Sequence, residues 1–395
     1  MAVQTIKRYV RPYAEVKENL LERAREQRNP FEACEYQVVQ QTLDELSSVD
    51  RDPWAAAWSD VALPYEQRAR EAEAGGDTEA AKLNYRRAYG YYRVGRYTTT
   101  NSPGKKEAYR KSAEMTLRWG AYLDPPIRQV EIPFAGRSGE GHVIPGYLRV
   151  PSIHPHPSPL SEGEGTRLQA PLLVQGTRPP LLVQWGGIDG FKEDRRDDNV
   201  LALGIASLSI DMPGVGDAPI PGSEDAERLF GAVFDWAATR PDIDGTRIAV
   251  WGRSTGGYWA AKAAHVFADR LRGAVDHGGC SHLAFTPEWI ETSQHGEYPF
   301  ELAETLAYAF GMETLDDWLR NSPRYSLLSQ GILERPCAPL LLINGVHDTI
   351  FPIQDMYLLL EHGSPKTARF YDTGHMGHTP RTDSDILSFL QQVLK

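Results

Sequence analysis

Residues 246–258, Thr-Arg-Ile-Ala-Val-Trp-Gly-Arg-Ser-Thr-Gly-Gly-Tyr, decide how the rest of the chain is interpreted. An apolar, β-branched run at 248–251 precedes Gly252-Arg-Ser-Thr-Gly256, and an alanine-rich stretch follows at 259–269. This order predicts a strand, a sharp turn and a helix, with the hydroxyl of Ser254 exposed at the start of the helix. Glycines on both sides fit such a turn, because the backbones approach too closely for a Cβ atom. We therefore expect Ser254 to be a nucleophile; the alternative is a turn serine that only caps the helix.

Length and charge limit the class of protein. The chain has 395 residues and a formal net charge of −11, with 41% hydrophobic and 24% charged residues. Such a length predicts two domains, and the acidic balance argues against a nucleic-acid or anionic membrane partner. The N-terminus lacks a signal-peptide pattern and no stretch reaches membrane-spanning length, so a cytoplasmic protein is expected. Cys34, Cys280 and Cys337 lack C-x-x-C spacing, which predicts neither a disulfide framework nor a zinc site, and no metal or cofactor is expected.

Residues 1–125 predict an all-helical N-terminal domain, because apolar and aromatic residues recur there at three- and four-residue spacing. The pattern covers 15–28, 31–49, 78–94 and 105–123. Breaks between these helices are expected at Pro53, Pro64, Gly75-Gly76 and 102–104. The segment 72–97 faintly resembles a helical repeat, but a single copy favours a helical bundle over an array.

Residues 126–395 predict a second domain of class α/β. Alternating residues at 130–134 and 142–150 predict an antiparallel hairpin, after which strands and helices alternate in the manner of a mostly parallel sheet. The expected strands are 181–185, 206–210, 248–251, 273–277, 340–344 and 368–371. One helix is expected after the N-cap Ser223, with an apolar face of Leu229, Phe230, Val233, Phe234 and Ala237.

Residues 151–179 interrupt this alternation with Pro, Ser, Gly and Glu, which predicts a flexible inserted surface loop. The pentapeptide Pro-Leu-Leu-Val-Gln occurs at 171–175 and again at 180–184. Because the second copy runs directly into Trp185-Gly-Gly187, it is the expected strand.

A serine nucleophile needs a histidine base, and the base needs a carboxylate that orients it. Asp348 follows the expected strand 340–344, and His375 follows the expected strand 368–371. The carboxyl ends of parallel strands are where such a sheet builds its site. Asp355 and Asp372 are the alternative acids. His378 is the alternative base, although His375 lies nearer the strand end and follows a glycine. His277, His282 and His347 are interpreted as loop or core histidines.

An oxyanion needs preorganised N–H donors, and we expect the first from Thr255, the residue after the nucleophile. The second is expected from Gly187 or Ile188, in the glycine-rich loop after the strand that ends at Trp185; the alternative is a simple chain reversal.

The segment 281–335 predicts a helical excursion rich in aromatic residues. Most of its aromatic rings are expected in the core, while some line a pocket for an aromatic or polyketide-like substrate. The candidate substrate contacts are Trp185, Glu288 and Trp289; for Glu288 and Glu291 a solvated helix face is the more ordinary interpretation.

Together these features resemble the α/β-hydrolases with a helical N-terminal domain, in particular the group of 2,6-dihydropseudooxynicotine hydrolase, the fungal heptaketide-shortening pigment hydrolases and FrsA-like esterases. The resemblance rests on 80–92, 145–151, Gly186-Gly-Ile-Asp-Gly-Phe-Lys-Glu193, the serine turn and the two late loops. It implies an α/β-hydrolase fold, with the helical domain as a lid over a cavity, and a homodimer.

The resemblance also implies a reaction. The expected function is a serine hydrolase with a Ser-His-Asp triad, which cleaves a carbon–carbon bond next to a ketone in a small β-dicarbonyl, polyketide-like or aromatic substrate. One alternative is a carboxylesterase or lactone hydrolase for bulky esters. Another is a non-catalytic binding protein on a hydrolase scaffold.

Overall fold

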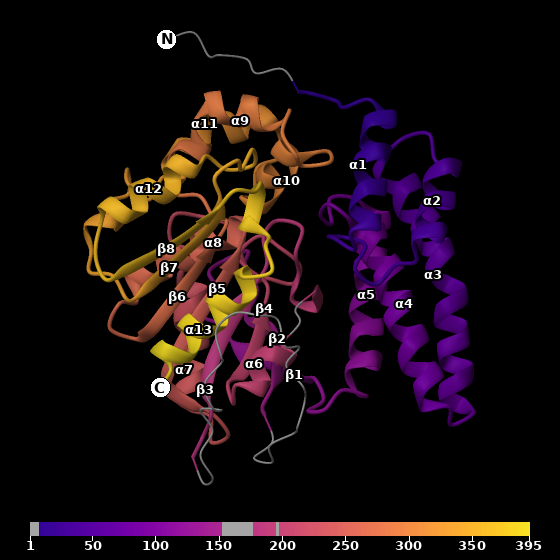
Figure 1. The fold of residues 1–395 in the computed structure, drawn as a ribbon, viewed down its shortest axis with the longest axis horizontal. Coiled ribbons are helices and arrows are strands. Elements are labelled where there is room, and N and C mark those ends of the chain that lie inside the picture. The colour runs from indigo at the N-terminus through magenta and orange to yellow at the C-terminus, as the bar shows by residue number, and fades with distance from the viewer. Residues whose placement is uncertain (1–7, 152–176, 195–196) are drawn as a thin grey trace. The chain divides into compact units, whose positions relative to one another are not determined.

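The computed structural model describes residues 8–151, 177–194 and 197–395, and its contacts divide the chain into two units (Figure 1). The helical unit comprises Tyr9–Ile127 and Pro299–Thr305, and the sheet unit comprises chiefly Arg128–Tyr298 and Leu306–Lys395. Residues 152–176 of the predicted insert, with the first copy of the pentapeptide, lie outside the described residues. No helix within the described ranges is both long and apolar enough to cross a membrane.

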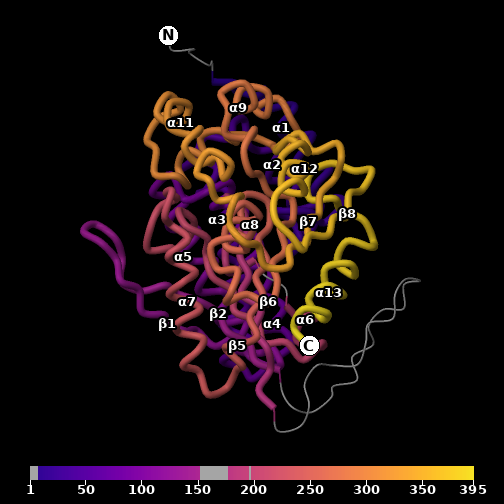
Figure 2. Tube along the Cα trace, turned by 90° about the vertical axis from the view of Figure 1, so that its left-hand side faces the viewer, coloured from indigo at the N-terminus to yellow at the C-terminus, as the bar shows by residue number. Residues whose placement is uncertain are grey.

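The sheet unit contains one sheet of eight strands in the order β1-β2-β4-β3-β5-β6-β7-β8. Figure 1 labels all eight strands, and Figure 2 shows the trace of the same chain turned by 90°. Both pairings of β2, with β1 and with β4, are antiparallel, and all other pairings are parallel. The predicted α/β class, a mostly parallel sheet that begins with an antiparallel hairpin, is confirmed. The strands are β1 Arg128–Pro133, β2 Val143–Arg149, β3 Pro180–Trp185, β4 Ala206–Ile210, β5 Asp244–Arg253, β6 Leu271–His277, β7 Leu340–Gly345 and β8 Lys366–Tyr371.

Helices cover both faces of this sheet. Side chains alternate between the two faces along each strand, so apolar side chains on both faces must be buried. Leu182, Ala249 and Val275 face α6 (Asp198–Ala202) and α13 (Thr382–Val393) in one core cluster. The helices α7 (Arg228–Ala238) and α8 (Thr255–Val266) contact β5. The other helices that lie wholly or partly in this unit are α9 Pro287–Ser293, α10 Leu302–Ala309, α11 Leu315–Asn321 and α12 Ile353–Glu361.

The predicted start of α7 is wrong, although its apolar face is confirmed. The helix begins at Arg228, and the hydroxyl of Ser223 donates to Asp225 Oδ1 in a preceding turn, so Ser223 is not its N-cap. The predicted apolar side chains of this helix are buried: Leu229, Phe230, Val233, Phe234 and Ala237.

The helical unit contains α1 Tyr13–Arg25, α2 Tyr36–Glu45, α3 Arg51–Ala74, α4 Thr78–Arg96 and α5 Pro103–Gly120. Pro64 lies inside α3, so the expected break there is wrong. Proline removes one helical hydrogen bond. The buried face of α3, with Trp54, Trp58 and Ala62 fully buried, outweighs that loss. Phe300, from the second segment of the unit, packs edge-on against Trp54 at 5.6 Å between ring centroids.

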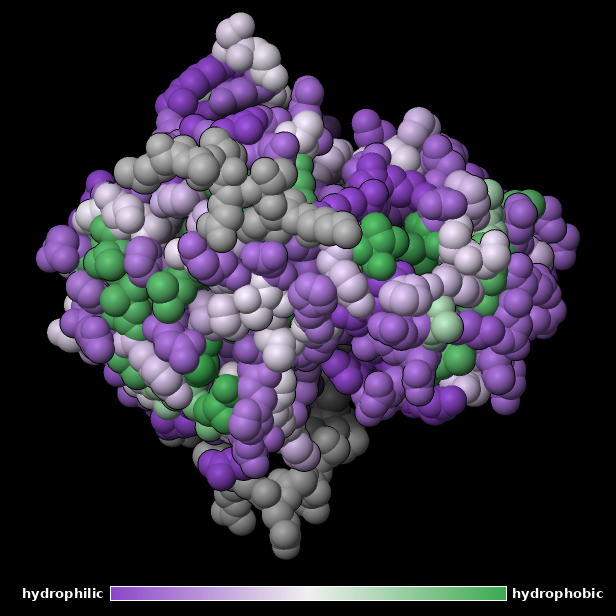
Figure 3. All heavy atoms as spheres, turned by 90° about the horizontal axis from the view of Figure 1, so that it is seen from above, coloured by the Kyte–Doolittle hydropathy of each residue, from purple (hydrophilic) through white to green (hydrophobic). Residues whose placement is uncertain are grey.

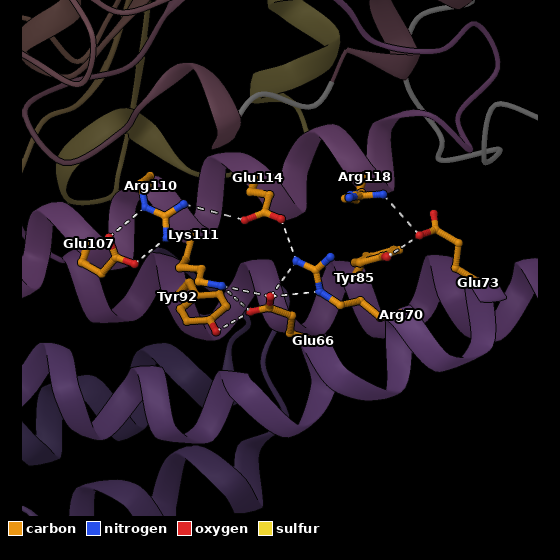
Figure 4. A network of polar contacts seen from close by, with 10 residues as sticks. All are labelled: Glu66, Arg70, Glu73, Tyr85, Tyr92, Glu107, Arg110, Lys111, Glu114 and Arg118. Atoms are coloured by element: carbon orange, nitrogen blue, oxygen red, sulfur yellow. Dashed lines mark hydrogen bonds and ion pairs between the residues drawn. The ribbon is translucent and has the colours of Figure 1, made fainter.

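A polar network joins α3, α4 and α5 within the helical unit (Figure 4). Glu66 is buried, and its carboxylate accepts hydrogen bonds from Tyr92 Oη (2.7 Å), Arg70 Nη2 (2.8 Å) and Lys111 Nζ (3.0 Å). A buried carboxylate is stable only when it is paired in this way.

On the face of the molecule drawn in Figure 3, hydrophilic side chains separate small groups of apolar ones.

Candidate active site

Ser254 lies at the sharp turn between β5 and α8, as predicted. Its φ is +54° and its ψ is −131°, a conformation that non-glycine residues rarely adopt. The flanking glycines are required by close approach: a Cβ at Gly252 would lie 1.9 Å from Gly256 O, and a Cβ at Gly256 would lie 2.2 Å from Gly186 O. The turn therefore places Ser254 directly before the N-terminus of α8.

The structure brings Ser254, His375 and Asp348 together from three distant parts of the chain. Ser254 Oγ lies 2.9 Å from His375 Nε2, and His375 Nδ1 lies 2.8 Å from Asp348 Oδ2. The side chain of Asp348 is fully buried and that of His375 is 11% exposed. Asp348 Oδ1 accepts the N–H groups of Ile350 and Phe351, which fixes the carboxylate.

The alternative acids and base lie elsewhere. Asp355 accepts four backbone N–H groups at 281–284. Asp372 is exposed and lies 2.7 Å from His347 Nε2. His378 is exposed, and its ring centroid lies 6.3 Å from that of His277. Of these candidates, His375 and Asp348 are the pair aligned with Ser254.

The surroundings of His375 favour its protonated form. Burial lowers the pKa of this imidazole, but the charge and hydrogen bond of Asp348, with the charges of Glu297 and Asp189, outweigh burial, so that the pKa is raised above 6.5. An imidazole with a raised pKa is a stronger base toward a serine proton.

Thr255 and Ile188, two of the three predicted oxyanion-hole residues, are buried, and Thr255 follows Ser254 directly. A Cβ at Gly187 would lie 3.1 Å from Ser254 Oγ, which places the loop after β3 directly against Ser254. Among the described residues, the N–H groups of Thr255 and Ile188 have no hydrogen-bond partner.

The three predicted substrate contacts, Trp185, Glu288 and Trp289, differ in burial and in their hydrogen-bond partners. Trp185 is fully buried, stacks on Phe230 at 4.3 Å and donates its indole N–H to Gly256 O, so it supports the turn from below. Glu288 is exposed in the first turn of α9. Trp289 is half-buried, and its indole N–H donates to Ile350 O, close to Asp348.

Glu297 contacts the site although no motif had indicated it, and Tyr298, one of the aromatic residues of the segment 281–335, contacts the site as well. Glu297 Oε1 accepts the N–H of His375 at 3.0 Å and the hydroxyl of Thr349 at 3.2 Å. Tyr298 Oη lies 3.2 Å from Asp189 Oδ2, in the loop after β3. Two consecutive residues thus contact the loops on either side of Ser254.

A buried ionic cluster lies behind the same loop after β3. Lys192 Nζ lies 2.9 Å from Glu193 Oε1 and 3.1 Å from Asp211 Oδ2, and its backbone N–H donates to Asp211 Oδ1. Burial raises the pKa of Glu193 to about 7. The cluster connects the loop after β3 with the loop after β4.

In the part of the chain that the structure describes, no group of three or more His, Cys, Asp or Glu side chains could hold a metal ion.

Comparisons with known proteins agree with this fold. Residues 169–367 match the family described as esterase FrsA-like. The α/β hydrolase gkaG of Penicillium citrinum is 31% identical over 245 residues, or 58% of this chain, and the chain spans about half (52%) of that relative's length. The 2,6-dihydropseudooxynicotine hydrolase of Paenarthrobacter nicotinovorans is 27% identical over 321 residues, 78% of this chain and 74% of the relative.

A solved structure of wild-type AbyA5 superposes with a TM-score of 0.71 at 22% identity, and the match covers 97% of this chain and 95% of that one. This likeness shows the α/β-hydrolase fold with its helical N-terminal region, as predicted. The family match extends over half of the sequence. The chain is therefore an α/β-hydrolase and belongs to the FrsA-like esterase family.

Proposed function

We propose that the protein is a serine hydrolase in which Ser254 is the nucleophile, His375 the base and Asp348 the acid that orients the base. The observation that carries the proposal is the alignment of Ser254 Oγ, the His375 imidazole and the Asp348 carboxylate at 2.9 and 2.8 Å. Hydrogen-bonded nucleophile, base and orienting acid are what acyl transfer requires.

In the proposed reaction, His375 Nε2 takes the proton of Ser254 as Oγ bonds to a substrate carbonyl carbon. The carbonyl oxygen becomes an oxyanion, and the N–H groups of Thr255 and Ile188 stabilise it. The bond to the leaving group then breaks, its electron pair departs with the leaving group, and His375 donates the proton to that group. Water then attacks the acyl-enzyme with His375 as base, the acyl–Oγ bond breaks, and His375 returns the proton to Ser254. Asp348 stabilises the imidazolium in both halves.

We propose as substrate a β-dicarbonyl, polyketide-like or aromatic ketone, cleaved at the carbon–carbon bond next to a ketone. The leaving group is then a carbanion stabilised as an enolate by the second carbonyl, which is why a 1,3-dicarbonyl is needed. Support comes from the similarity over most of the chain to a hydrolase named for 2,6-dihydropseudooxynicotine.

A second candidate function is hydrolysis of bulky carboxylic esters or lactones. The observation that favours it is the family match itself, which carries the description of an esterase. The same residues serve both reactions, because only the leaving group differs: an alkoxide for the ester and an enolate for the diketone.

A fluorophosphonate probe tests the proposed nucleophile. We expect it to label the wild-type protein but neither S254A nor H375A, since a serine hydroxyl without its base is a weak nucleophile. Labelling of S254A to the wild-type extent would overturn the proposal. Turnover of p-nitrophenyl esters beside a panel of β-diketones then separates the two substrate classes: turnover of esters alone would exclude carbon–carbon cleavage.

A further inference from the structure

We propose that His277 and Asn344 are positioning residues, which hold the loop of the base His375 in register with Ser254 and Asp348. The inference rests on the proposed roles of those three residues. It adds two side chains that touch neither the substrate nor the reacting atoms.

The strand order places both residues beside the site. The strands β6, β7 and β8 are adjacent and parallel, so their carboxyl ends lie at one edge of the sheet. His277 is the last residue of β6, Asn344 is the next-to-last residue of β7, and His375 follows the end of β8. Each of the three loops after these strands is therefore within reach of the next.

His277 connects the nucleophile turn with the loop of the base. Its carbonyl oxygen accepts the N–H of Ser254 at 2.7 Å, and its Nε2 lies 2.7 Å from the carbonyl oxygen of Met376. Because a carbonyl only accepts hydrogen bonds, Nε2 carries the proton. Burial lowers the pKa of His277 well below its usual range, so the ring is neutral and Nδ1 is unprotonated. A ring stack with Trp251, 6.0 Å between centroids, fixes the imidazole.

Asn344 connects the acid with the same loop. Its Oδ1 accepts the N–H groups of Met376 and Gly345, each at 2.9 Å, and its Nδ2 donates to Asp348 Oδ2 at 2.7 Å. Asp348 Oδ2 is also the oxygen nearest to His375 Nδ1. The fully buried amide of Asn344 thus shares one carboxylate oxygen with the base.

These contacts close a ring of hydrogen bonds through the site. It runs from Ser254 N–H to His277, to the Met376 peptide, to Asn344, to Asp348, to His375, and back to Ser254 Oγ.

Met376 is the residue in this ring that needs support. Its φ is +71°, a left-handed conformation that is uncommon for side chains other than glycine. Such a conformation persists where the surroundings fix it on more than one side. Asn344 holds the N–H of Met376 and His277 holds its carbonyl, so loss of either contact is expected to move the adjacent His375.

The test uses paired variants of the full chain. H277L removes the N–H donor, and H277Q retains a donor at similar reach. We expect H277L to lower kcat and the rate of fluorophosphonate labelling by about 10- to 100-fold at nearly unchanged KM, since small misplacements of a reacting group cost about that much. We expect H277Q to recover activity to within roughly threefold of wild type.

H265L is the matched control. His265 is buried to the same extent as His277, and it too contacts a backbone carbonyl: its Nδ1 lies 3.0 Å from the carbonyl oxygen of Arg335. His265 takes no part in the ring of hydrogen bonds. Wild-type kcat in H277L, or equal losses in H277L and H265L, would overturn the proposal.

NMR titration of labelled histidines gives a second arm that does not depend on turnover. Burial lowers the pKa of His375 and Asp348 raises it. We therefore expect a His375 that has moved away from Asp348 to show a lower pKa in H277L and in N344L than in the wild type. An unchanged His375 titration would refute the inference. If the wild type does not react with the probe, the proposed function fails, and this titration still decides the inference.

Discussion

The carboxylate of Glu297 accepts the backbone N–H of His375 at 3.0 Å and adds a negative charge close to its imidazole. Because this charge helps raise the pKa of His375, and only the neutral imidazole acts as a base, activity must fall as the pH drops through that pKa. We expect E297Q to keep the hydrogen-bond acceptor and to shift the acid limb of the kcat/KM profile to lower pH. E291Q, on the exposed face of α9, is the control. An unshifted acid limb in E297Q would contradict this role.

Gly187 leaves no room for a side chain beside Ser254, the proposed nucleophile. A Cβ there would lie 2.8 Å from Ser254 Cβ, closer than real Cβ contacts come. We expect G187A to lower kcat by about 100- to 1,000-fold, comparable to the loss of an oxyanion-hole donor, because the loop must move away. In G231A, the new Cβ would meet the Phe267 ring at an ordinary 3.4 Å, so activity should stay near wild type. Steady-state kinetics of both variants provide the measurement.

Asp276 makes folding stability depend on pH. It is fully buried and accepts the Gly279 N–H at 2.8 Å, and burial, with the charge of Asp355, raises its pKa from 3.8 to about 7. The folded protein therefore binds this proton more tightly than the unfolded chain. The resulting stabilisation is complete below pH 3.8 and is lost as the pH rises through about 7.

We expect D276N to gain unfolding free energy relative to wild type as the pH rises from 5 to 8, by at most about 3 kcal/mol. Urea unfolding of both proteins across this range is the measurement. Parallel stability curves for the two proteins would show that Asp276 does not titrate as expected.

Glu66 is expected to contribute more to stability than any exposed ion pair of the network in Figure 4. Its removal leaves the buried Tyr92 hydroxyl and the partly buried Lys111 without their acceptor. We expect E66A to lower the unfolding free energy by roughly 2 kcal/mol. E107A, which breaks an exposed pair with Arg110, should cost less than about 1 kcal/mol. Denaturant unfolding of both variants is the measurement. Equal losses of unfolding free energy in E66A and E107A would contradict the prediction.

Local patterns predicted the strands and the nucleophile turn well, because the signals lie within a few residues. Gly252 and Gly256 surround Ser254, and the apolar strands end next to Asp348 and just before His375. The chain order of these three residues then sufficed to propose the site.

The remaining contacts depend on how distant segments pack. Glu297 reaches His375 across 78 residues, and no spacing in the sequence encodes that approach. Asn344 did carry a signal, a polar residue at the end of the apolar run 340–343, but its partners follow only from the order of β6, β7 and β8. Helix α3 was missed because Pro64 suggested a break, whereas the tertiary packing of Trp54 and Trp58 decides the helix.

The second segment of the helical unit, Pro299–Thr305, has a consequence for biosynthesis. Phe300 packs against Trp54, and Glu301 pairs with Arg51 at 3.0 Å, yet the ribosome makes these partners long after the five helices and after Ser254 itself. The first domain to emerge is therefore completed only after most of the sheet domain has been made, and a gene cut after codon 127 would encode helices that lack part of their own interior.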